Sequence, residues 1–347
     1  MLPFASPLMP MLAEAQDEIP RGEGWVYEPK WDGFRAIVFR DGDAVHLCSR
    51  NGQPLERYFP EVLATLKTVL PERCIVDGEL ILPGVKGLDF DALQARIHPA
   101  PSRVKRLSEE TPAGFTGFDL LAVGDDDLRE LPFSARRERL LTVLRATEQA
   151  FPTPQTASAD EATTWFHDFE GAGCDGIIAR RVELPYSPGK RVMVKVKHYR
   201  TADVVIGGYR VGKTPDSIGA LLLGVYDHAG AFHPVGHTSS FKAKEKRDLF
   251  ARLSPMALPV PPIPPEPEQK SRWTRTPKGQ EQAPWTFIEP SLVIEVRYDY
   301  LQGRRFRHAS TFLRWRSDKA PKDCLQSQLE PPNAFSLSRI VALATGR

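Results

Sequence analysis

The sequence predicts an α+β fold in two parts: a domain with antiparallel sheets over residues 1–200 and an all-β barrel over residues 201–347. A length of 347 residues corresponds to two domains, at about 150 residues each. Strand-like and helix-like patterns alternate irregularly up to residue 200, and short β segments prevail after it. With 26% charged and 41% hydrophobic residues, the composition is that of a globular protein rather than a disordered chain.

The first predicted domain mixes strands and helices. An early antiparallel hairpin is expected, because an Asp41-Gly42 turn separates two strand-like runs. Helical periodicity follows Pro60 and also Ser134, which can cap a helix. Since the elements do not form a strict strand–helix–strand repeat, we expect antiparallel sheets. The expected strands are 25–28, 36–39, 44–48, 74–82, 176–179 and 192–196, and the expected helices are 61–70, 134–146 and 162–169.

The second predicted domain contains about five short strands and a helix, which together fit a small barrel. Its clearest elements are strands at 204–209, 220–226 and 292–298 and a helix at 243–253. Seven prolines lie within residues 255–267. They favour a stiff surface loop, with a polyproline ligand for a partner protein as the alternative.

The net charge of +2 conceals an asymmetry along the chain. Residues 1–200 contain 25 Lys and Arg against 30 Asp and Glu, whereas residues 201–347 contain 21 against 14. The first part is therefore −5 and the second +7. This division either reflects chance on solvated surfaces or indicates that the C-terminal part meets a polyanion.

The cysteines and the N-terminus restrict the protein class further. The four cysteines are isolated, with no C-x-x-C pair, which excludes a disulfide framework and a structural zinc site. The N-terminus lacks a signal-peptide pattern, and no apolar run approaches the ~18 residues of a membrane span. We therefore expect a cytoplasmic protein without a membrane partner.

The most informative segment is Glu28–Arg35, which places Lys30 in a turn between two predicted strands. A lysine amine acts as a nucleophile when burial or neighbouring cations lower its pKa. Alone, the K-x-D-G pattern fits a surface turn equally well. Other groups suited to nucleotide chemistry follow in order: Ser49–Gly52, Asp77–Leu80, Phe118–Leu121, Asp175–Arg180, Lys195–Lys197 and Arg316–Lys319.

This ordered set resembles the covalent nucleotidyltransferase superfamily, and most closely the ATP-dependent DNA ligases of the small bacterial C type. The ligase module of bacterial ligase D is also similar. The resemblance runs over nearly the whole chain, from Pro10–Ala13 to Leu292–Lys319. It implies an adenylation (nucleotidyltransferase) domain over residues 1–200, an OB-fold barrel over 201–347, and an ATP-dependent enzyme that seals nicks, with a role in DNA repair.

The resemblance assigns Lys30 as the nucleophile that attacks the ATP α-phosphate and becomes lysyl-AMP. Lys195 and Lys197 are expected to lower the Lys30 pKa and to stabilise charge on the phosphate. Asp32 joins these as a catalytic residue that could help hold Mg²⁺ or its waters.

The remaining pocket residues are implied by the same resemblance. Glu79 would bind the ribose and Phe118 would stack on adenine, although Phe118 could simply be a buried strand residue. Glu28 would lie beside the purine edge. Arg35 would bind the ribose and Arg50 a nick phosphate, with structural salt bridges as the alternative for both.

Metal binding, to Mg²⁺ or Mn²⁺, is assigned to Asp175 with Asp32. Here the chain departs from the commoner pattern, which has Glu at position 175. A second departure is Met193-Val194, where the family often has Trp-Leu.

In the second domain, Arg316, Asp318 and Lys319 would close onto the β- and γ-phosphates and later move away, which requires a hinge near 198–201. Eight Lys and Arg with interleaved aromatic residues between 297 and 322 suit DNA-backbone contacts.

The expected partners are nicked duplex DNA and other DNA-repair proteins, and we expect a monomer that is nucleoid-associated when bound to DNA. Three alternatives stay open: an mRNA-capping-type guanylyltransferase that uses GTP, an RNA ligase, and a non-catalytic nucleic-acid-binding scaffold. An NAD-dependent ligase is disfavoured, because its zinc cysteines are missing and only 29 residues precede Lys30.

Overall fold

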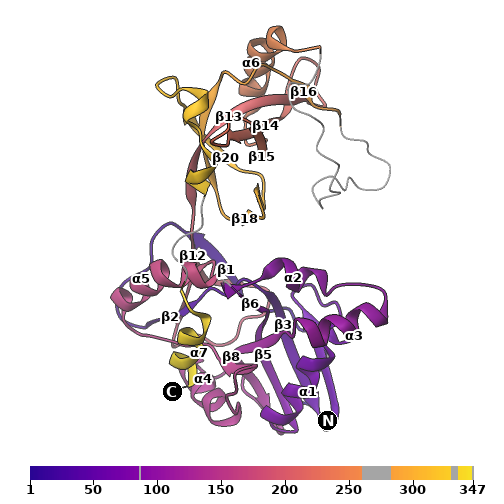
Figure 1. The fold of residues 1–347 in the computed structure, drawn as a ribbon. Helices are drawn as coiled ribbons and strands as arrows, with labels where there is room; N and C mark the ends of the chain where they lie inside the picture. The colour runs from indigo at the N-terminus through magenta and orange to yellow at the C-terminus, as the bar shows by residue number, and fades with distance from the viewer. Residues whose placement is uncertain (86, 260–282, 330–334, 346–347) are drawn as a thin grey trace. The chain divides into compact units, whose positions relative to one another are not determined.

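The computed structural model describes residues 1–85, 87–259, 283–329 and 335–345 and divides the chain into two compact units (Figure 1). The first unit contains Met1–His198 and Pro331–Arg347, and the second contains Tyr199–Glu330. The sequence placed the boundary two residues later and assigned the whole C-terminus to the second domain. Part of the proline-rich stretch 255–267 lies outside the described residues, so its proposed roles stay open.

The strands of the first unit are β1 (Leu12–Gln16), β2 (Trp25–Pro29), β3 (Phe34–Asp41), β4 (Ala44–Ser49), β5 (Arg73–Ile81), β6 (Pro83–Gly84), β7 (Gly87–Leu88), β8 (Gly114–Val123), β9 (Asp126–Asp127), β10 (Ala150–Pro152), β11 (Gly176–Arg181) and β12 (Arg191–Lys197). Its helices are α1 (Pro60–Val69), α2 (Phe90–Ala95), α3 (Pro101–Glu110), α4 (Phe133–Val143), α5 (Ala159–Asp168), the 3₁₀ turn η2 (Phe169–Ala172) and α7 (Leu337–Thr345).

Two mixed sheets form the first unit. One has the order β1-β12-β11-β2, and the other has the order β10-β8-β5-β3-β4 with β9 beside β8. Most neighbours are antiparallel, as expected, but β1 pairs with β12 and β10 with β8 in parallel. Parallel neighbours need a long connection. Helix α4 lies between β8 and β10 in the sequence, and most of the domain separates β1 from β12.

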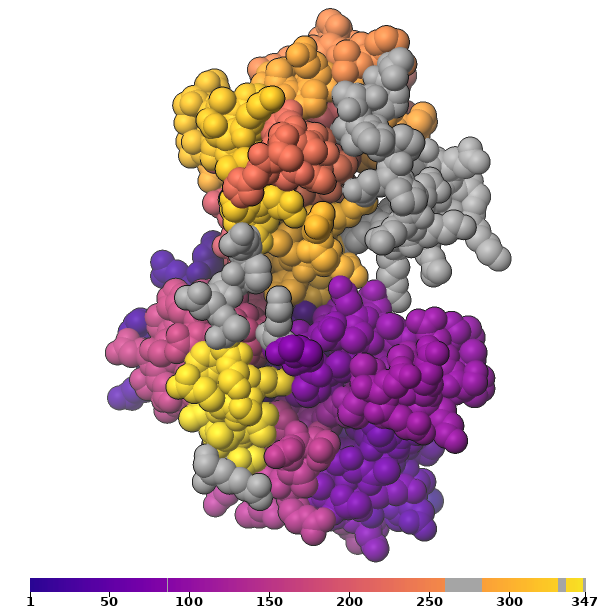
Figure 2. Space-filling view, in the orientation of Figure 1, coloured from indigo at the N-terminus to yellow at the C-terminus, as the bar shows by residue number. Residues whose placement is uncertain are grey.

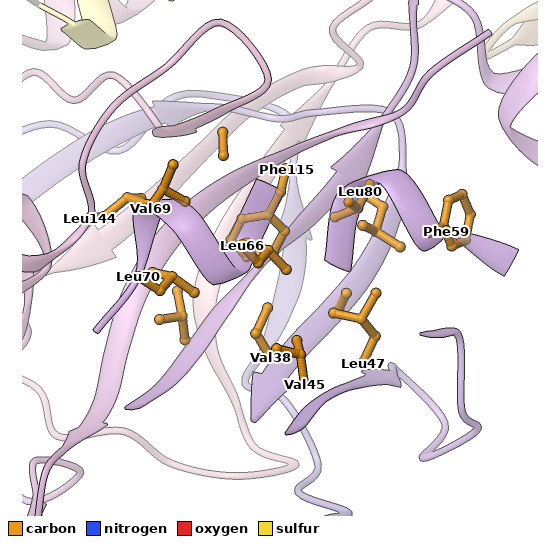
Figure 3. Close-up of a cluster of buried hydrophobic side chains, with 14 of the residues drawn as sticks. Val38, Val45, Leu47, Phe59, Leu66, Val69, Leu70, Leu80, Phe115 and Leu144 are labelled. Carbon is orange, nitrogen blue, oxygen red and sulfur yellow. The ribbon is translucent and has the colours of Figure 1, made fainter. Parts of the chain in front are cut away.

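The six-stranded sheet is buried on both faces, and its strands sort their side chains by alternation. Along β3, Ala36 and Val38 join one buried cluster while Ile37 and Phe39 join another. Figure 3 shows side chains from α1 and from β3, β4, β5 and β8 gathered in the first cluster. Arg35 on β3 pairs with Glu79 on β5, on the same side of the sheet as Ile37. The alternation therefore buries apolar side chains on both faces, and on the face of Ile37 it also places Arg35 and Glu79 side by side.

The second unit is a sheet with the order β15-β14-β13-β17-β20, with β16 beside β13. Its apolar core alternates along the strands in the same way and includes Val204, Ile206, Leu221 and Leu223. Among the described residues, the edge strands β15 and β20 share no ladder, and a bridge from Thr238 to Ser310 joins their neighbourhood. This unit is therefore the sheet-rich second domain that was expected, and closure of its sheet into an OB-fold barrel stays a prediction. Its elements are β13 (Arg200–Val211), β14 (Ile218–Tyr226), β15 (Phe232–Thr238), α6 (Ala243–Leu253), β16 (Thr286–Phe287), β17 (Val293–Tyr298), β18 (Leu301–Gln302), β19 (Arg305–Phe306) and β20 (Thr311–Trp315).

The C-terminal helix α7 completes the core of the first unit. Ile340 is fully buried in a cluster with Phe151 and Trp165. Figure 2 shows the C-terminal residues, in yellow, lying on the surface of this unit. The sequence does hold the signal for this helix, because Leu337, Ile340 and Val341 repeat at helical spacing. No helix within the described residues has the length and apolar character needed to cross a lipid bilayer.

Replacing the buried side chain of α7 tests this packing. We expect Ile340→Ala to lower the free energy of unfolding by about 2–4 kcal/mol, because it leaves a cavity in the core. Leu343 of the same helix is 54% exposed, so Leu343→Ala is the matched control and should have little effect. Urea denaturation followed by circular dichroism measures both. Equal losses in the two variants would contradict the packing of Ile340 against the first unit.

Candidate active site

A cavity of ≈ 570 Å³ opens in the first unit, between its two sheets. Its walls come from β2, β3, β5, β8, β11 and β12 and from the turn after β4. The sequence had singled out residues from each of these places, and also from β1 and β4, which contribute Leu12, Ala13 and Ser49. Eight predicted site residues line this cavity: Glu28, Lys30, Arg35, Arg50, Glu79, Phe118, Lys195 and Lys197.

Backbone pairing fixes Lys30 opposite Asp175. The Lys30 N–H donates to the carbonyl of Gly176 at 2.8 Å, and the Asp175 N–H donates to the Lys30 carbonyl at 2.7 Å. These bonds extend the β2–β11 ladder by one residue pair. Gly176 has φ +130°, and a Cβ at this position would lie 2.0 Å from the Val196 carbonyl oxygen. Glycine is therefore required for the close approach of β11 and β12 beside Lys30.

The Asp175 carboxylate is shared by two lysines. Its Oδ2 lies 2.7 Å from Lys30 Nζ and 2.9 Å from Lys197 Nζ. Burial alone would raise the pKa of Asp175, but the two ammonium groups hold it below its usual value. This carboxylate therefore stays ionised between the two cations.

The ionisation of Lys30 differs from the prediction. Burial, the largest single influence, lowers its pKa, but Asp175 with Glu79 and Asp32 raises the pKa above its ordinary value. The expected lowering by Lys195 and Lys197 is thus outweighed by carboxylates that the sequence did not show to be so close. Lys195 is instead the lysine with a lowered pKa, through burial and then through Lys197 and Lys30. In the ligand-free protein, Lys30 is an ammonium ion.

Arg35 forms a buried salt bridge that also covers an aromatic ring. Its Nε and Nη2 donate to the two carboxylate oxygens of Asp77, each at 2.6 Å. Tyr186 donates its hydroxyl to the same carboxylate at 2.7 Å. The guanidinium carbon lies 4.5 Å from the centre of the Phe118 ring. Arg35 is therefore held rigidly at the cavity wall by a structural salt bridge, the alternative considered for it.

Glu79 lines the cavity as a carboxyl group with a raised pKa. Burial raises the pKa to about 7, and Arg35 and Lys30 only partly oppose this. Near neutral pH the empty pocket therefore holds this group in both protonation states.

Glu28 is fixed by a residue that the sequence did not assign a role. Arg180 Nε lies 2.9 Å from Glu28 Oε2, and Gln155 Nε2 donates to Glu28 Oε1 at 3.2 Å. Arg180 also lines the cavity, and its guanidinium carbon lies 5.4 Å from the Phe118 ring centre. The available signal was its place at the end of the Asp175–Arg180 segment, which had been noted for its acid.

The structure shows what surrounds the two predicted metal ligands, Asp175 and Asp32. Asp175 contacts Lys30 and Lys197, and Asp32 is buried and close enough to raise the Lys30 pKa. Within the described part of the chain, no group of three or more His, Cys, Asp or Glu side chains is arranged to hold a metal ion.

The predicted residues of the second unit form a cluster of their own. Arg316 Nε donates to Asp318 Oδ1 at 2.9 Å, and Arg316 Nη1 donates to Asp203 Oδ1 at 2.7 Å. Lys319 Nζ donates to Asp203 Oδ2 at 2.9 Å. The sequence predicted Arg316, Asp318 and Lys319 as site residues. It did not predict Asp203, which is 113 residues from Arg316 in the chain.

Known proteins that are similar to this chain are DNA ligases. A family described as "ATP dependent DNA ligase domain" matches residues 10–197, and "ATP dependent DNA ligase C terminal region" matches residues 214–319. The chain is 47% identical to DNA ligase C of Mycobacterium tuberculosis, over 98% of both chains. It is 30% identical to the multifunctional non-homologous end joining DNA repair protein LigD of the same organism, over 87% of this chain and 37% of that protein.

A solved structure titled as a structure-function analysis of Lig E DNA ligases shares the fold, with a TM-score of 0.56 and 18% identity, over 89% of this chain and 99% of that chain. The first family match alone spans more than half of the sequence, and it contains every residue of the cavity. The chain therefore belongs to the ATP-dependent DNA ligases.

Proposed function

We propose that this ligase seals nicks between 3′-hydroxyl and 5′-phosphate ends in duplex DNA through a covalent lysyl-AMP at Lys30. The observation that carries the proposal is the position of Lys30, whose amine lies beside Asp175 in a cavity of ≈ 570 Å³ that Lys195 and Lys197 of β12, two strands away in the sheet, also line. A lone surface lysine would have none of these neighbours.

In the first step, the Lys30 amine loses its proton and forms a nitrogen–phosphorus bond to the ATP α-phosphorus. The bond from that phosphorus to the bridging oxygen breaks, and pyrophosphate leaves. Lys195 and Lys197 stabilise the charge on the phosphoryl oxygens. Because Lys30 is paired with Asp175, deprotonation requires a change in the charges around it when the nucleotide enters.

The same cavity supplies the groups that hold the nucleoside. Phe118 offers a ring for adenine, and Glu79 offers a carboxyl group for the ribose hydroxyls. Glu28, held by Arg180, would lie at the purine edge, and Arg35 would contact the ribose from its fixed position. Arg50, on the turn after β4, is assigned to a nick phosphate.

A divalent cation, Mg²⁺ or Mn²⁺, fits the donors of this site when it arrives with the nucleotide. Magnesium commonly binds through one or two carboxylates together with substrate phosphates and water, and Asp175 and Asp32 are the carboxylates beside Lys30. When bound, it would neutralise phosphate charge. Asp175 would then exchange an ammonium partner for the metal.

The later steps use the DNA. The 5′-phosphate at the nick attacks the lysyl-AMP phosphorus and takes the AMP, and the 3′-hydroxyl then displaces AMP to form the phosphodiester bond. The cluster of Arg316, Asp318 and Lys319 is assigned to the first step, in which its two cations bind the β- and γ-phosphates, and the units divide within the predicted hinge. The +7 charge of residues 201–347 suits backbone contacts that tolerate any sequence.

The role in DNA repair is supported by the similarity to a ligase whose name includes end joining and repair. Action as a monomer in the cytoplasm, at the nucleoid when DNA is bound, is part of the same proposal. The two ligase family matches favour this function over a capping guanylyltransferase, an RNA ligase or a non-catalytic scaffold.

Substituting the nucleophile tests the mechanism directly. Lys30→Ala and Lys30→Arg should abolish labelling of the protein by α-labelled ATP, because neither side chain can form the phosphoramidate. The control is Lys190→Ala, which removes an exposed lysine of the same domain. Labelling is read after denaturing electrophoresis, followed by a chase with nicked DNA, nicked RNA–DNA hybrid or RNA. Labelling of Lys30→Ala at the wild-type level would refute the proposal.

The raised pKa of Glu79 predicts a pH dependence of stability in the nucleotide-free protein. Between the pKa near 4.3 in the unfolded chain and about 7 in the folded one, the folded state binds more protons, so stability falls as pH rises. The Glu79→Gln variant has no carboxyl group to ionise at this position. Its free energy of unfolding, relative to that of the wild type, should therefore rise by up to about 3 kcal/mol from pH 4 to pH 8.

Urea denaturation at the two pH values measures this difference. Glu14→Gln, at an exposed carboxylate of β1, is the control and should leave the pH dependence unchanged. A parallel pH dependence in Glu79→Gln and the wild type would show that Glu79 titrates normally.

A further inference from the structure

Asp203 accepts hydrogen bonds from both cations that the proposed function assigns to the terminal phosphates. Arg316 Nη1 donates to Asp203 Oδ1 at 2.7 Å and to Oδ2 at 2.9 Å. Lys319 Nζ donates to the same Oδ2 at 2.9 Å. One carboxylate oxygen therefore joins the two cations, which are three residues apart in the chain.

Asp203 is itself fixed from both sides of its backbone. It lies near the start of β13, where its register partner on β17 is Glu295. The Asp203 N–H donates to Gln328 Oε1 at 2.9 Å, and Gln328 Nε2 donates to the Asp203 carbonyl at 3.0 Å. The Gln328 side-chain amide therefore pairs with the backbone of β13 as a neighbouring strand would. The carboxylate thus projects from a rigid element rather than from a loop.

The two carboxylates around Arg316 differ in exposure. The Asp203 side chain is 13% exposed, whereas the Asp318 side chain, which binds Nε and Nη2, is 64% exposed. An anion arriving from solvent can therefore displace Asp318 while Asp203 stays in place. Lys319 Nζ donates one of its three hydrogens to Asp203, which leaves the others for a second acceptor.

We propose that Asp203 is a positioning residue for adenylylation, which holds Arg316 and Lys319 side by side so that they bind the β- and γ-phosphates together. The inference rests on the proposed role of those two cations. Without Asp203, two long side chains of like charge would repel and sample many conformations, and the nucleotide would have to order them on binding. With Asp203, their spacing is set before the nucleotide arrives.

The test separates the step that uses the triphosphate from the step that does not. Asp203→Asn keeps the side-chain shape but removes the charge, and it should raise the KM for ATP in lysyl-AMP formation by about 10-fold or more. Sealing of a nick that already carries AMP on its 5′-phosphate needs no ATP, and its rate should stay within about 2-fold of the wild type. Glu295→Gln is the matched control and should leave the KM for ATP unchanged. It neutralises the register partner of Asp203, whose Oε2 lies 2.6 Å from Arg314 Nε and not beside the two proposed phosphate-binding cations.

Gln328→Ala provides a second variant that leaves the carboxylate intact. Loss of its two hydrogen bonds to the Asp203 backbone should raise the KM for ATP in the same direction but less. Three outcomes overturn the inference: an unchanged KM for ATP in Asp203→Asn, a lowered KM, which would make Asp203 a competitor of the phosphates, or equal losses in both steps, which would indicate a merely structural role.

Arg316→Ala and Lys319→Ala distinguish failure of the inference from failure of the proposed function. If both retain the wild-type KM for ATP, the assignment of these cations to the phosphates is wrong. If either raises the KM while Asp203→Asn does not, the cations act as proposed and only the role of Asp203 is wrong.

Discussion

The site depends on the two ion pairs that the Asp175 carboxylate forms with Lys30 and Lys197. Two ammonium groups in one poorly solvated cavity repel each other and favour loss of a proton, and a buried carboxylate removes this conflict. Strand pairing positions Lys30, Asp175 and Lys197. Strand β11 lies between β2 and β12, and Asp175 immediately precedes its first residue. The required glycine at position 176 then allows β12 to approach closely enough for Lys197 to reach the same oxygen.

This arrangement gives the ligand-free enzyme a resting state. A raised Lys30 pKa means that the proposed nucleophile is protonated, and an ammonium ion has no lone pair with which to attack phosphorus. In the proposed mechanism, activation would therefore depend on the substrate, whose phosphates would offer Lys197 a second acceptor. A lysine whose pKa was already lowered in the empty pocket would react with other electrophiles. The paired state avoids that reactivity until the nucleotide changes the local charge.

The fold and the site differ in how far the sequence could predict them. The hairpin of β3 and β4 and the helices α1, α4 and α5 followed from local periodicity and turns, and the structure confirms them. Eight of the ten predicted site residues of the first unit line one cavity, and a ninth, Asp175, contacts Lys30 and Lys197. The direction of the Lys30 pKa was wrong, because the sequence does not show the distances between Lys30 and groups 145 to 167 positions later, and the structure places the Asp175 carboxylate against Lys30. Arg180 and Asp203 were missed for the same reason. The return of α7 to the first unit is likewise a long-range outcome.

Both units hold two neighbouring cations together with one buried carboxylate. In the first, Asp175 lies between two lysines, and in the second, Asp203 lies between Arg316 and Lys319. Each carboxylate is largely buried and belongs to or adjoins a strand, while the cations it joins retain some exposure. A site built to bind a polyanion must hold several cations together before the anion arrives, and a buried carboxylate does this without occupying the solvent side. In the proposed function these cations would meet the phosphates from preset positions, and the free-energy cost of bringing like charges together would fall on folding rather than on binding.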